Sequence, residues 1–455
     1  MADGKLRRIR DPIHGLISFD MNDPIEQLCW TLLDCREFQR LRRVKQLGFS
    51  ELVYPGATHT RIAHSVGVFN NARKLLRTIA IRTGQDIDEY RKAVVLCSAL
   101  LHDIGHGPFS HAFESALKPL EEKRDHEKWS AAIIQGDTEI RTWLDRYDPR
   151  LADDVAALLR RRDPVNIYDS VVHSQFDADR LDYVCRDRYM TGIGSGAVDT
   201  DWLFDCLDVG TLPLNHGGEE DDVIEAQGFF LNGKGLQAAE GYLLGRYHLY
   251  QQVYLHKTTR SAEKMLTALI SAILRPTIEG RVGDIGLRDD DVLVRFLRAP
   301  MSLSVYLSLD DTVMWAALER MAGAPDVYVA ELATRLRDRR LFKCIDIGER
   351  AAGHEGDQQE LMFRKRLGDT LNAKRGKRIL EDRPSVSAYS RYGSDEQGAF
   401  QRVMAGSLDP SKRPTDIRDR SNVIKALESR KLYRVYVAGE DESREVEALW
   451  EDLKR

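Results

Sequence analysis

The stretch AVVLCSALLHDIGHGPFSH, residues 93–111, decides the fold of this chain. Residues 90–104 are apolar on almost every side of a helix, which predicts a helix buried inside a core. Gly105 and the turn residues after it end that helix. Pro108 suits the first turn of a second helix, which we expect over residues 108–117. The sequence therefore predicts two helices joined by a glycine-containing turn.

The polar residues at this junction indicate a metal site. Asp103 stands at the end of an apolar helix, where a carboxylate is costly unless it is paired or bound to a metal. Its neighbour His102 offers a neutral imidazole, and imidazole with carboxylate is a natural ligand pair for a divalent metal. The dipeptide alone is common, but six of the 12 histidines fall within residues 59–126. These six are His59, His64, His102, His106, His111 and His126.

The rest of the chain is predicted to be mostly helical. Apolar periodicity predicts helices over residues 60–80, 151–161, 178–190, 236–270 and within 291–345. Residues 207–235 predict loops with a small hairpin. After residue 346 the sequence is more polar, and residues 432–439 predict a strand followed by a helix. The expected fold class is mostly α, with small β-hairpins and a minor α+β lobe at the C-terminal end.

The composition excludes several classes of protein. The 455 residues predict one large domain with an appended lobe, or two to three domains. A net charge of −5 argues against a protein that coats DNA, which would be basic. The six cysteines form no C-x-x-C pair and are interpreted as buried, reduced thiols. No apolar run is long enough for a signal peptide or a membrane span, so we expect a cytoplasmic protein that does not contact a membrane.

A second constellation lies within FDADRLDYVCRD, residues 176–187. Asp179, Tyr183 and Asp187 recur every four residues and would share one stripe of a helix. The simpler interpretation is a solvated face with ion pairs, such as Asp182 with Arg186. Beside a histidine-rich region, however, a tyrosine between two aspartates favours the wall of a pocket.

Together these residue types point to phosphate chemistry. Two histidines and two carboxylates around a metal leave positions open for water, and the metal lowers the pKa of that water towards neutrality. Nearby histidines could act as general acid or base. Arg61, Arg180 and Arg246 carry guanidinium groups that suit phosphate oxygens. The residue chemistry therefore predicts a metal-dependent phosphohydrolase.

The order of His64, His102–Asp103 and Asp179 resembles the motif of the HD-domain phosphohydrolases. Seven blocks, in order from about residue 9 to 345, are similar to the dNTP triphosphohydrolases, which include the animal sterile-alpha-motif HD-domain enzyme and bacterial relatives. No counterpart of the sterile-alpha-motif domain is recognised. The blocks are RDPIHG (10–15), FQRLRRVKQLG (38–48), YPGATHTRIAHS (54–65), LLHDIGHGPFSH (100–111), DADRLDYVCRD (177–187), YLHK (254–257) and RRLFK (339–343).

The resemblance implies hydrolysis of a dNTP to a deoxynucleoside and inorganic triphosphate. The implied ligands of a divalent transition metal (Mn, Fe or Zn) are His64, His102, Asp103 and Asp179. The implied catalytic residues are His111, as general acid, with Glu114, His106, His126 and Glu127. The implied contacts to the triphosphate, with Mg²⁺, are Arg61, Arg180, Tyr183 and Arg246. The implied contacts to deoxyribose and base are Gln46, Leu47, Asp187 and Tyr254, with Tyr183 packed against the sugar so that a 2′-hydroxyl is rejected.

The resemblance also implies nucleotide effectors bound between subunits of a homo-oligomer, most readily a tetramer. The residues that match a guanine-nucleotide (GTP) site are Asp34, Gln39, Arg42, Arg339 and Lys343. The residues that match a neighbouring dNTP effector site are Val53, Tyr54, Lys234, His256 and Lys257. We expect an HD phosphohydrolase domain over residues 1–345 and a regulatory or oligomerisation lobe over 346–455.

Two alternatives remain open at the level of sequence. One is an HD phosphohydrolase for another nucleotide phosphate ester, such as a cyclic nucleotide or an oligonucleotide. The other is a nucleotide sensor, or a binder of single-stranded nucleic acid, with a degenerate site; the basic stretches FQRLRRVK and AKRGKR motivate it. The net negative charge and the complete set of metal ligands oppose the second alternative.

Overall fold

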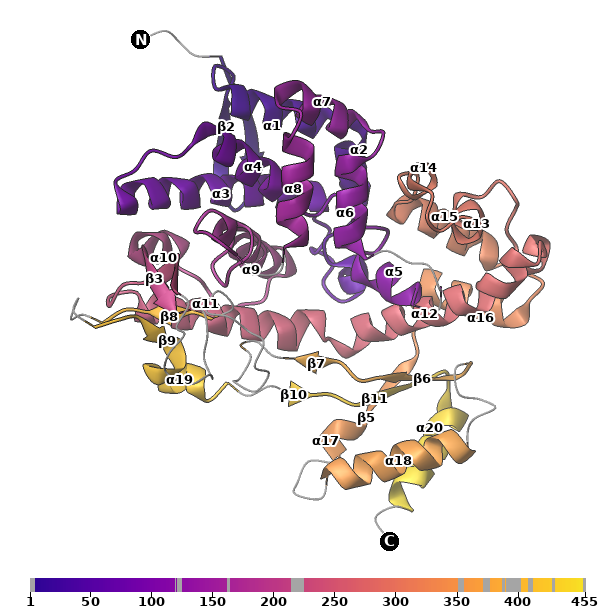
Figure 1. The fold of residues 1–455 in the computed structure, drawn as a ribbon. Coiled ribbons are helices and arrows are strands. Elements are labelled where there is room, and N and C mark those ends of the chain that lie inside the picture. Colours follow the sequence, from indigo (N-terminus) through magenta and orange to yellow (C-terminus); the bar gives the residue numbers. More distant parts are fainter. Residues whose placement is uncertain are drawn as a thin grey trace.

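The computed structural model describes residues 5–118, 120, 125–161, 164–213, 225–350, 356–370, 377–386, 389, 402–407, 412–427 and 430–452. Most of these residues lie in helices, which confirms the expected mostly α fold (Figure 1). Within these ranges, no helix combines the length and the apolar character that crossing a bilayer would require.

A β-hairpin and a bundle of helices form the first half of the chain (Figure 1). The antiparallel hairpin consists of β1 (Leu6–Asp11) and β2 (Gly15–Asp20). The helices are α1 (Pro24–Asp34), α2 (Arg36–Gln39), α3 (Arg61–Thr83), α4 (Glu89–Leu101), α5 (His111–Ala116), α6 (His126–Gln135), α7 (Glu139–Tyr147), α8 (Leu151–Arg160), α9 (Ala178–Thr191) and α10 (Thr200–Cys206). The central helix α3 packs against both α4 and α9, and buried apolar side chains of these three helices belong to the first apolar core. The predicted helices over 60–80, 151–161 and 178–190 are thus confirmed as α3, α8 and α9.

The ends of the two helices around the His–Asp doublet differ from the prediction. Helix α4 begins at an Asp88 cap and ends at Leu101, so His102 and Asp103 lie in the turn that follows. Helix α5 begins only at His111, and Pro108 lies in the turn before it. The expected helix over 108–117 is therefore too long at its start. His102 itself keeps helical backbone angles as the C-cap of α4, so the doublet stands at the start of the turn after α4.

The predicted helix over 236–270 is interrupted. Its parts are α11 (Leu236–Leu249), a π-helical turn over Tyr250–Tyr254 and α12 (Lys257–Ile278). His256 caps α12, accepting the backbone N–H of Thr258 with its side chain. Short π-helical turns recur at functional sites. Apolar spacing does not reveal this break, since both halves keep a helical period.

A second apolar core surrounds α12, which runs across the molecule (Figure 1). The surrounding helices are α13 (Val292–Arg298), α14 (Leu303–Tyr306), α15 (Asp311–Met321) and α16 (Val327–Arg337). Helix α5 also packs on α12. The second core is thereby tied to the segment that carries His111.

The C-terminal part contains a small sheet with helices on it and a segment that returns to the first core (Figure 1). The three-stranded sheet has the order β5 (Lys343–Asp346), β11 (Arg434–Val437), β6 (Ile379–Asp382), with both pairings antiparallel. Its helices are α17 (Ile347–Arg350), α18 (Gly356–Thr370) and α20 (Glu440–Glu451), and a further strand pair joins β7 (Ser385–Val386) to β10 (Arg430–Lys431). The expected strand over 432–439 is β11, followed by the expected helix, α20.

The returning segment extends the hairpin predicted within 207–235. That hairpin is β3 (Leu207–Pro213) and β4 (Glu225–Leu231), whose connection over 214–224 lies outside the described residues. Strands β8 (Met404–Ala405) and β9 (Thr415–Asp416) add to β4, and α19 (Asn422–Lys425) packs on α11. Ile417 and Ile424 are buried in the first apolar core. The division of the chain at residue 345/346 stays a prediction, because β5 spans it.

Candidate active site

A cavity of about 520 Å³ lies where α3, α9, α6 and the turn after α4 meet the 250–263 segment. This volume is within the range of pockets that hold small ligands. The predicted site residues that line it are Gln46, Leu47, Arg61, His102, Asp103, His106, His111, His126, Glu127, Asp179, Arg180, Tyr183, Asp187 and Tyr254. The structure therefore brings most of the predicted catalytic and substrate residues to one place.

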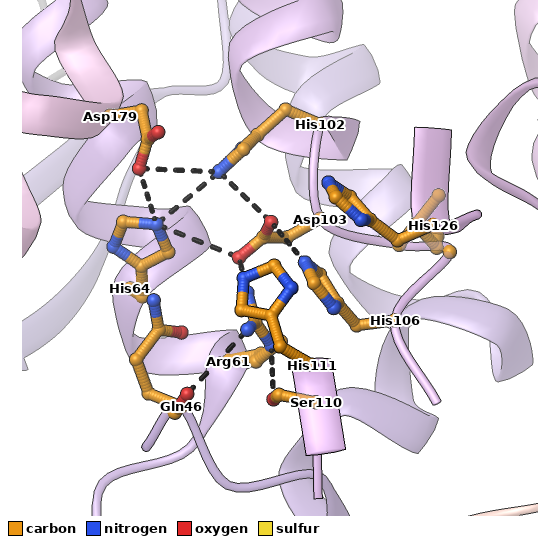
Figure 2. Close-up of polar contacts among 12 residues, drawn as sticks. Gln46, Arg61, His64, His102, Asp103, His106, Ser110, His111, His126 and Asp179 are labelled. Atoms are coloured by element: carbon orange, nitrogen blue, oxygen red, sulfur yellow. Dashed lines mark hydrogen bonds and ion pairs between the residues drawn. The ribbon is translucent and has the colours of Figure 1, made fainter. Parts of the chain in front are cut away.

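Three of the four predicted metal ligands, His102, Asp103 and Asp179, line this cavity, and the fourth, His64, is fully buried directly behind them (Figure 2). Nε2 of His64 lies 3.2 Å from Nε2 of His102 and 3.0 Å from Oδ1 of Asp179. Asp103 places Oδ1 3.4 Å from Nε2 of His102 and Oδ2 3.6 Å from Nε2 of His64. Donor atoms that share one metal at about 2.1 Å are separated by roughly 3.0–3.4 Å. The ligand atoms of His64, His102 and Asp103 therefore lie close enough to hold a single divalent ion, and Asp179 borders this group at 3.0 Å from His64 and 3.8 Å from His102.

Both imidazoles are held so that Nε2 faces the other ligands. The carboxylate of Asp182 can only accept, so Nδ1 of His64 donates to it, at 2.7 Å. Nδ1 of His102 donates to the backbone carbonyl of Ala99, at 2.9 Å. In the neutral form of each imidazole, Nε2 then carries a lone pair. This tautomer is the one in which a histidine binds a metal through Nε2.

The electrostatics of the cluster favour a cation. Burial lowers the pKa of His64, but hydrogen bonds to Asp179 and Asp182 outweigh it and raise that pKa to about 10. Burial raises the pKa of Asp103, yet the charges of Arg61 and His102 hold it well below its usual range. The carboxylates around His64 favour a positive charge at this point, since they keep a proton on its buried imidazole. A divalent ion would supply that positive charge in place of the proton.

A strained turn connects the doublet to α5. Phe109 and Ser110 have φ angles of 51° and 54°, in the left-handed region that residues other than glycine rarely adopt. Asp311 accepts the backbone N–H of Phe109 at 2.7 Å. Arg61 donates from Nε to Oγ of Ser110 at 2.9 Å and forms an ion pair with Asp103. These contacts hold a backbone conformation that costs about 1–3 kcal/mol per residue. Phe109 and Ser110 both line the cavity.

A second histidine cluster borders the first (Figure 2). Nε2 of His106 lies 3.2 Å from Oδ1 of Asp103, and its ring stacks on His126 with centroids 4.1 Å apart. Glu114 accepts from Nδ1 of His126 at 3.0 Å and lies 3.6 Å from Nδ1 of His111. Burial raises the pKa of Glu114, but the two histidines lower it far more; burial lowers the pKa of His126, but Glu114 raises it overall. Glu114 thus orients both imidazoles through Nδ1.

Aromatic and carboxylate groups form the opposite wall. Asp187 is held by His59 at 2.8 Å and by the hydroxyl of Tyr254 at 2.7 Å. The rings of Tyr254 and Tyr183 meet edge to face, with centroids 6.3 Å apart. Oε1 of Gln46 is buried and has no hydrogen-bond partner among the described residues. The wall therefore presents two fixed rings and one free acceptor.

The arginines differ in their exposure to the cavity. Arg180 lines it and forms an ion pair with Asp177. Arg246 is buried, donates to Oε1 of Gln175 at 2.7 Å and does not line the cavity. Arg61 lines the cavity beside Asp103. Two of the three predicted phosphate-binding arginines therefore reach the cavity directly.

The residues predicted for effector sites lie outside the cavity. Gln39 accepts from Nε of Arg42 at 2.7 Å beside the end of α1. Arg339 donates to the carbonyl of Leu52 at 2.7 Å, and the ring of Tyr54 lies 6.0 Å from that of His256. Arg339 is thus close to the segment that carries Val53 and Tyr54. The remaining predicted effector residues outside the cavity are Asp34, Lys234, Lys257 and Lys343.

The sequence interpretation missed the residues that support the metal ligands. Asp182 and Arg186 do form the expected ion pair, but both are buried rather than solvated. His14 donates to Asp182 at 2.7 Å, and His59 holds Asp187. The RDPIHG block draws attention to the segment that contains His14. Its partner Asp182 lies 168 residues further along the chain, so nothing in the sequence indicates that the two side chains meet.

Comparisons with known proteins show the family of this chain. Residues 61–183 match the HD domain, and residues 223–366 match an HD associated region. An uncharacterized protein of Bacillus subtilis, YwfO, is 32% identical over 357 residues, which are 76% of this chain and 73% of that protein. A deoxynucleoside triphosphate triphosphohydrolase, the SAMHD1 homolog of Dictyostelium discoideum, is 32% identical over 267 residues, 57% of this chain and 48% of that protein. The crystal structure of a phosphohydrolase from Bacteroides thetaiotaomicron superposes with a TM-score of 0.73 at 26% identity, covering 95% of this chain and 100% of that one.

Proposed function

Because the chain belongs to the HD-domain family, we propose that it is a metal-dependent phosphohydrolase that cleaves dNTPs into deoxynucleoside and inorganic triphosphate. One observation carries the proposal. Nε2 atoms of two histidines, 3.2 Å apart, converge with two carboxylates beside a cavity that also holds arginines and an aromatic wall. The similarity to proteins named dNTP triphosphohydrolases supports the choice of substrate.

His64, His102, Asp103 and Asp179 would hold the metal, which would be Mn, Fe or Zn. When bound, a divalent ion supplies a water of lowered pKa and withdraws charge from a phosphoryl oxygen. The chain contributes the fixed orientation of His64 and His102, whose Nδ1 atoms are held by Asp182 and Ala99, and the metal would replace the proton on Nε2 of His64. It also contributes Arg61, whose guanidinium keeps Asp103 ionised.

The proposed reaction joins the oxygen of water to the α-phosphorus and breaks the bond from that phosphorus to the 5′-oxygen of the nucleoside. His111 would donate the proton that the 5′-oxygen needs as it leaves. The imidazole of His111 lines the cavity, its side chain is 68% exposed, and Glu114 lies at its Nδ1. A general acid held in this way contributes about 10²–10⁴-fold to the rate.

The triphosphate would lie, with Mg²⁺, near Arg61 and Arg180. Arg246 would contribute its positive charge to the triphosphate from behind Gln175, to which it donates a hydrogen bond. The deoxyribose and base would face the wall of Asp187, Tyr254, Gln46 and Leu47, with the ring of Tyr183 against the sugar. The free Oε1 of Gln46 could accept a hydrogen bond from a base.

Regulation is part of the proposal. Guanine-nucleotide or dNTP effectors would bind at the two predicted sites between subunits of a homo-oligomer, most readily a tetramer. The biological role would be control of the dNTP pool or depletion of dNTPs during phage infection. Size-exclusion chromatography with light scattering, with and without GTP and dNTPs, tests the assembly.

Anion-exchange chromatography of the products tests the reaction. Each dNTP is incubated with Mn²⁺ and Mg²⁺, with and without GTP, alongside a panel of cyclic nucleotides. We expect inorganic triphosphate and deoxynucleoside in equal amounts, and none from the Asp179→Ala variant. Pyrophosphate with monophosphate, or turnover of cyclic nucleotides alone, would reject the dNTP proposal in favour of another phosphate ester.

A further inference from the structure

The N-terminal hairpin reaches the support of the metal ligands. His14 lies just after β1, at the turn of the hairpin, and its side chain is 6% exposed. We propose that His14 is a positioning residue for the metal, acting through Asp182 on His64, so that the β1–β2 hairpin governs how tightly the metal is held. This inference rests on the proposed metal at His64, His102, Asp103 and Asp179.

The carboxylate of Asp182 connects His14 to His64. It is fully buried and accepts four hydrogen bonds. His14 Nε2 reaches Oδ1 at 2.7 Å and His64 Nδ1 reaches Oδ2 at 2.7 Å, while Arg186 donates from Nη2 to Oδ1 at 2.9 Å and from Nε to Oδ2 at 2.7 Å. An ionised carboxylate offers about four acceptor sites, so all are filled. Removing the His14 donor would leave one acceptor site of this buried carboxylate unpaired and weaken the hold on its orientation towards His64.

Asp11 fixes His14 from the other side. Its Oδ1 accepts the backbone N–H groups of Ile13 and His14, at 2.8 and 2.9 Å. Its Oδ2 accepts from Nη1 of Arg186 at 2.8 Å. The Asp11 carboxylate therefore fixes the turn that contains His14, and it also links that turn to Arg186, which pairs with Asp182. The hairpin cannot shift without disturbing this buried network.

The charge of the network favours the metal. Asp11 and Asp182 carry two negative charges and Arg186 one positive charge, so the buried group has one net negative charge beside His64. A carboxylate that accepts from a ligand imidazole makes the imidazole a better donor to the metal and fixes its orientation. His14 would supply the fourth hydrogen bond that keeps this carboxylate in place.

Metal affinity tests the proposal without using turnover. Mn²⁺ is titrated into the metal-free protein, and free Mn²⁺ is counted by electron paramagnetic resonance. His14→Phe keeps a ring but removes the donor, and we expect its Kd for Mn²⁺ to rise by about 10- to 100-fold, as for other residues that support metal ligands. His14→Gln restores an N–H donor and should stay within about 3-fold of the wild type. Arg8→Gln, an exposed change on β1 of the same hairpin, should leave Kd unchanged.

Thermal unfolding in EDTA and in Mn²⁺ separates positioning from a merely structural role. A structural role would lower the melting temperature of His14→Phe in EDTA and leave its Kd for Mn²⁺ at the wild-type value, which would overturn the proposal. If His14→Phe does not fold, Asp11→Asn carries the same test: a higher Kd supports the proposal and an unchanged Kd overturns it. Failure of the wild type itself to bind Mn²⁺ would instead reject the metal site of the proposed function.

Discussion

Gly67 of α3 allows a sharp test, because two effects of opposite sign compete there. In an ordinary helix interior, Gly→Ala stabilises a protein by about 1 kcal/mol. At this position a Cβ would overlap with Oδ1 of Asp182 and lie 2.5 Å from Nη2 of Arg186 and 2.8 Å from Cγ of Asp182. Non-bonded carbon contacts are most favourable at roughly 3.5–4.0 Å. The buried ion pair must therefore move away from α3.

The expected loss of stability follows from displacement of the buried ion pair between Asp182 and Arg186. Disrupting a buried, hydrogen-bonded ion pair costs about 3–5 kcal/mol, which exceeds the gain in helix propensity. We expect Gly67→Ala to lower the free energy of unfolding by about 2–4 kcal/mol in urea titrations. Because Asp182 holds His64, Mn²⁺ binding should weaken as well. Gly283→Ala is the matched control, since a Cβ there meets nothing within 4 Å.

A gain in stability for Gly67→Ala would refute this reasoning. It would mean that α3 and α9 can move apart at the contact of Gly67 with Asp182 without a loss of folding free energy. A loss of stability with unchanged Mn²⁺ affinity would refute only the link between Asp182 and the metal.

Three further predictions concern the cavity. His111→Gln should lower kcat for a dNTP by about 10²–10⁴-fold while the Mn²⁺ content, measured by mass spectrometry, stays at the wild-type level; loss of the metal would assign His111 a different role. The pKa of His126 is raised above 6.5, so its pairing with Glu114 should stabilise the fold fully below pH 6.5 and progressively less as pH rises through the raised pKa. Urea titrations from pH 5.5 to 9, about that window, should show this fall in the wild type, and Glu114→Gln should make it shallower, leaving the part that His64 contributes. Tyr254→Phe removes the hydrogen bond to Asp187 and should raise KM by about 3- to 10-fold with little change in kcat; an unchanged KM would contradict contact with the nucleoside.

The helical fold and the metal-ligand set could be predicted from the sequence for a physical reason. A charged doublet at the end of an apolar helix has few stable solutions, so His102 and Asp103 by themselves indicate a polar cluster. The resemblance named His64 and Asp179 as their partners, and the structure brings all four together. Their role in metal binding stays a prediction.

The supporting residues could not be predicted in this way. His14 and Asp182 meet only because the hairpin folds over the start of α3 and α9, and local spacing carries no trace of that contact. The break at residues 250–254 is invisible in the apolar pattern because α11 and α12 share one period. Pro108 lies ahead of α5 rather than in its first turn, because the strained turn at Phe109 and Ser110 is held by Asp311, which lies far along the chain.

The pairing of β4 with β8 has a consequence for how the protein is made. Residues 225–231 pair with β3 on one side and obtain their neighbour on the other side from residues 404–405, and Ile417 and Ile424 complete the first core. A nascent chain that has emerged from the ribosome only as far as α16 therefore still exposes apolar surface that its last roughly fifty residues will cover. Contacts at such sequence separation slow folding. We expect truncated or stalled chains to depend on chaperones even though the residues of the candidate metal site are already synthesised.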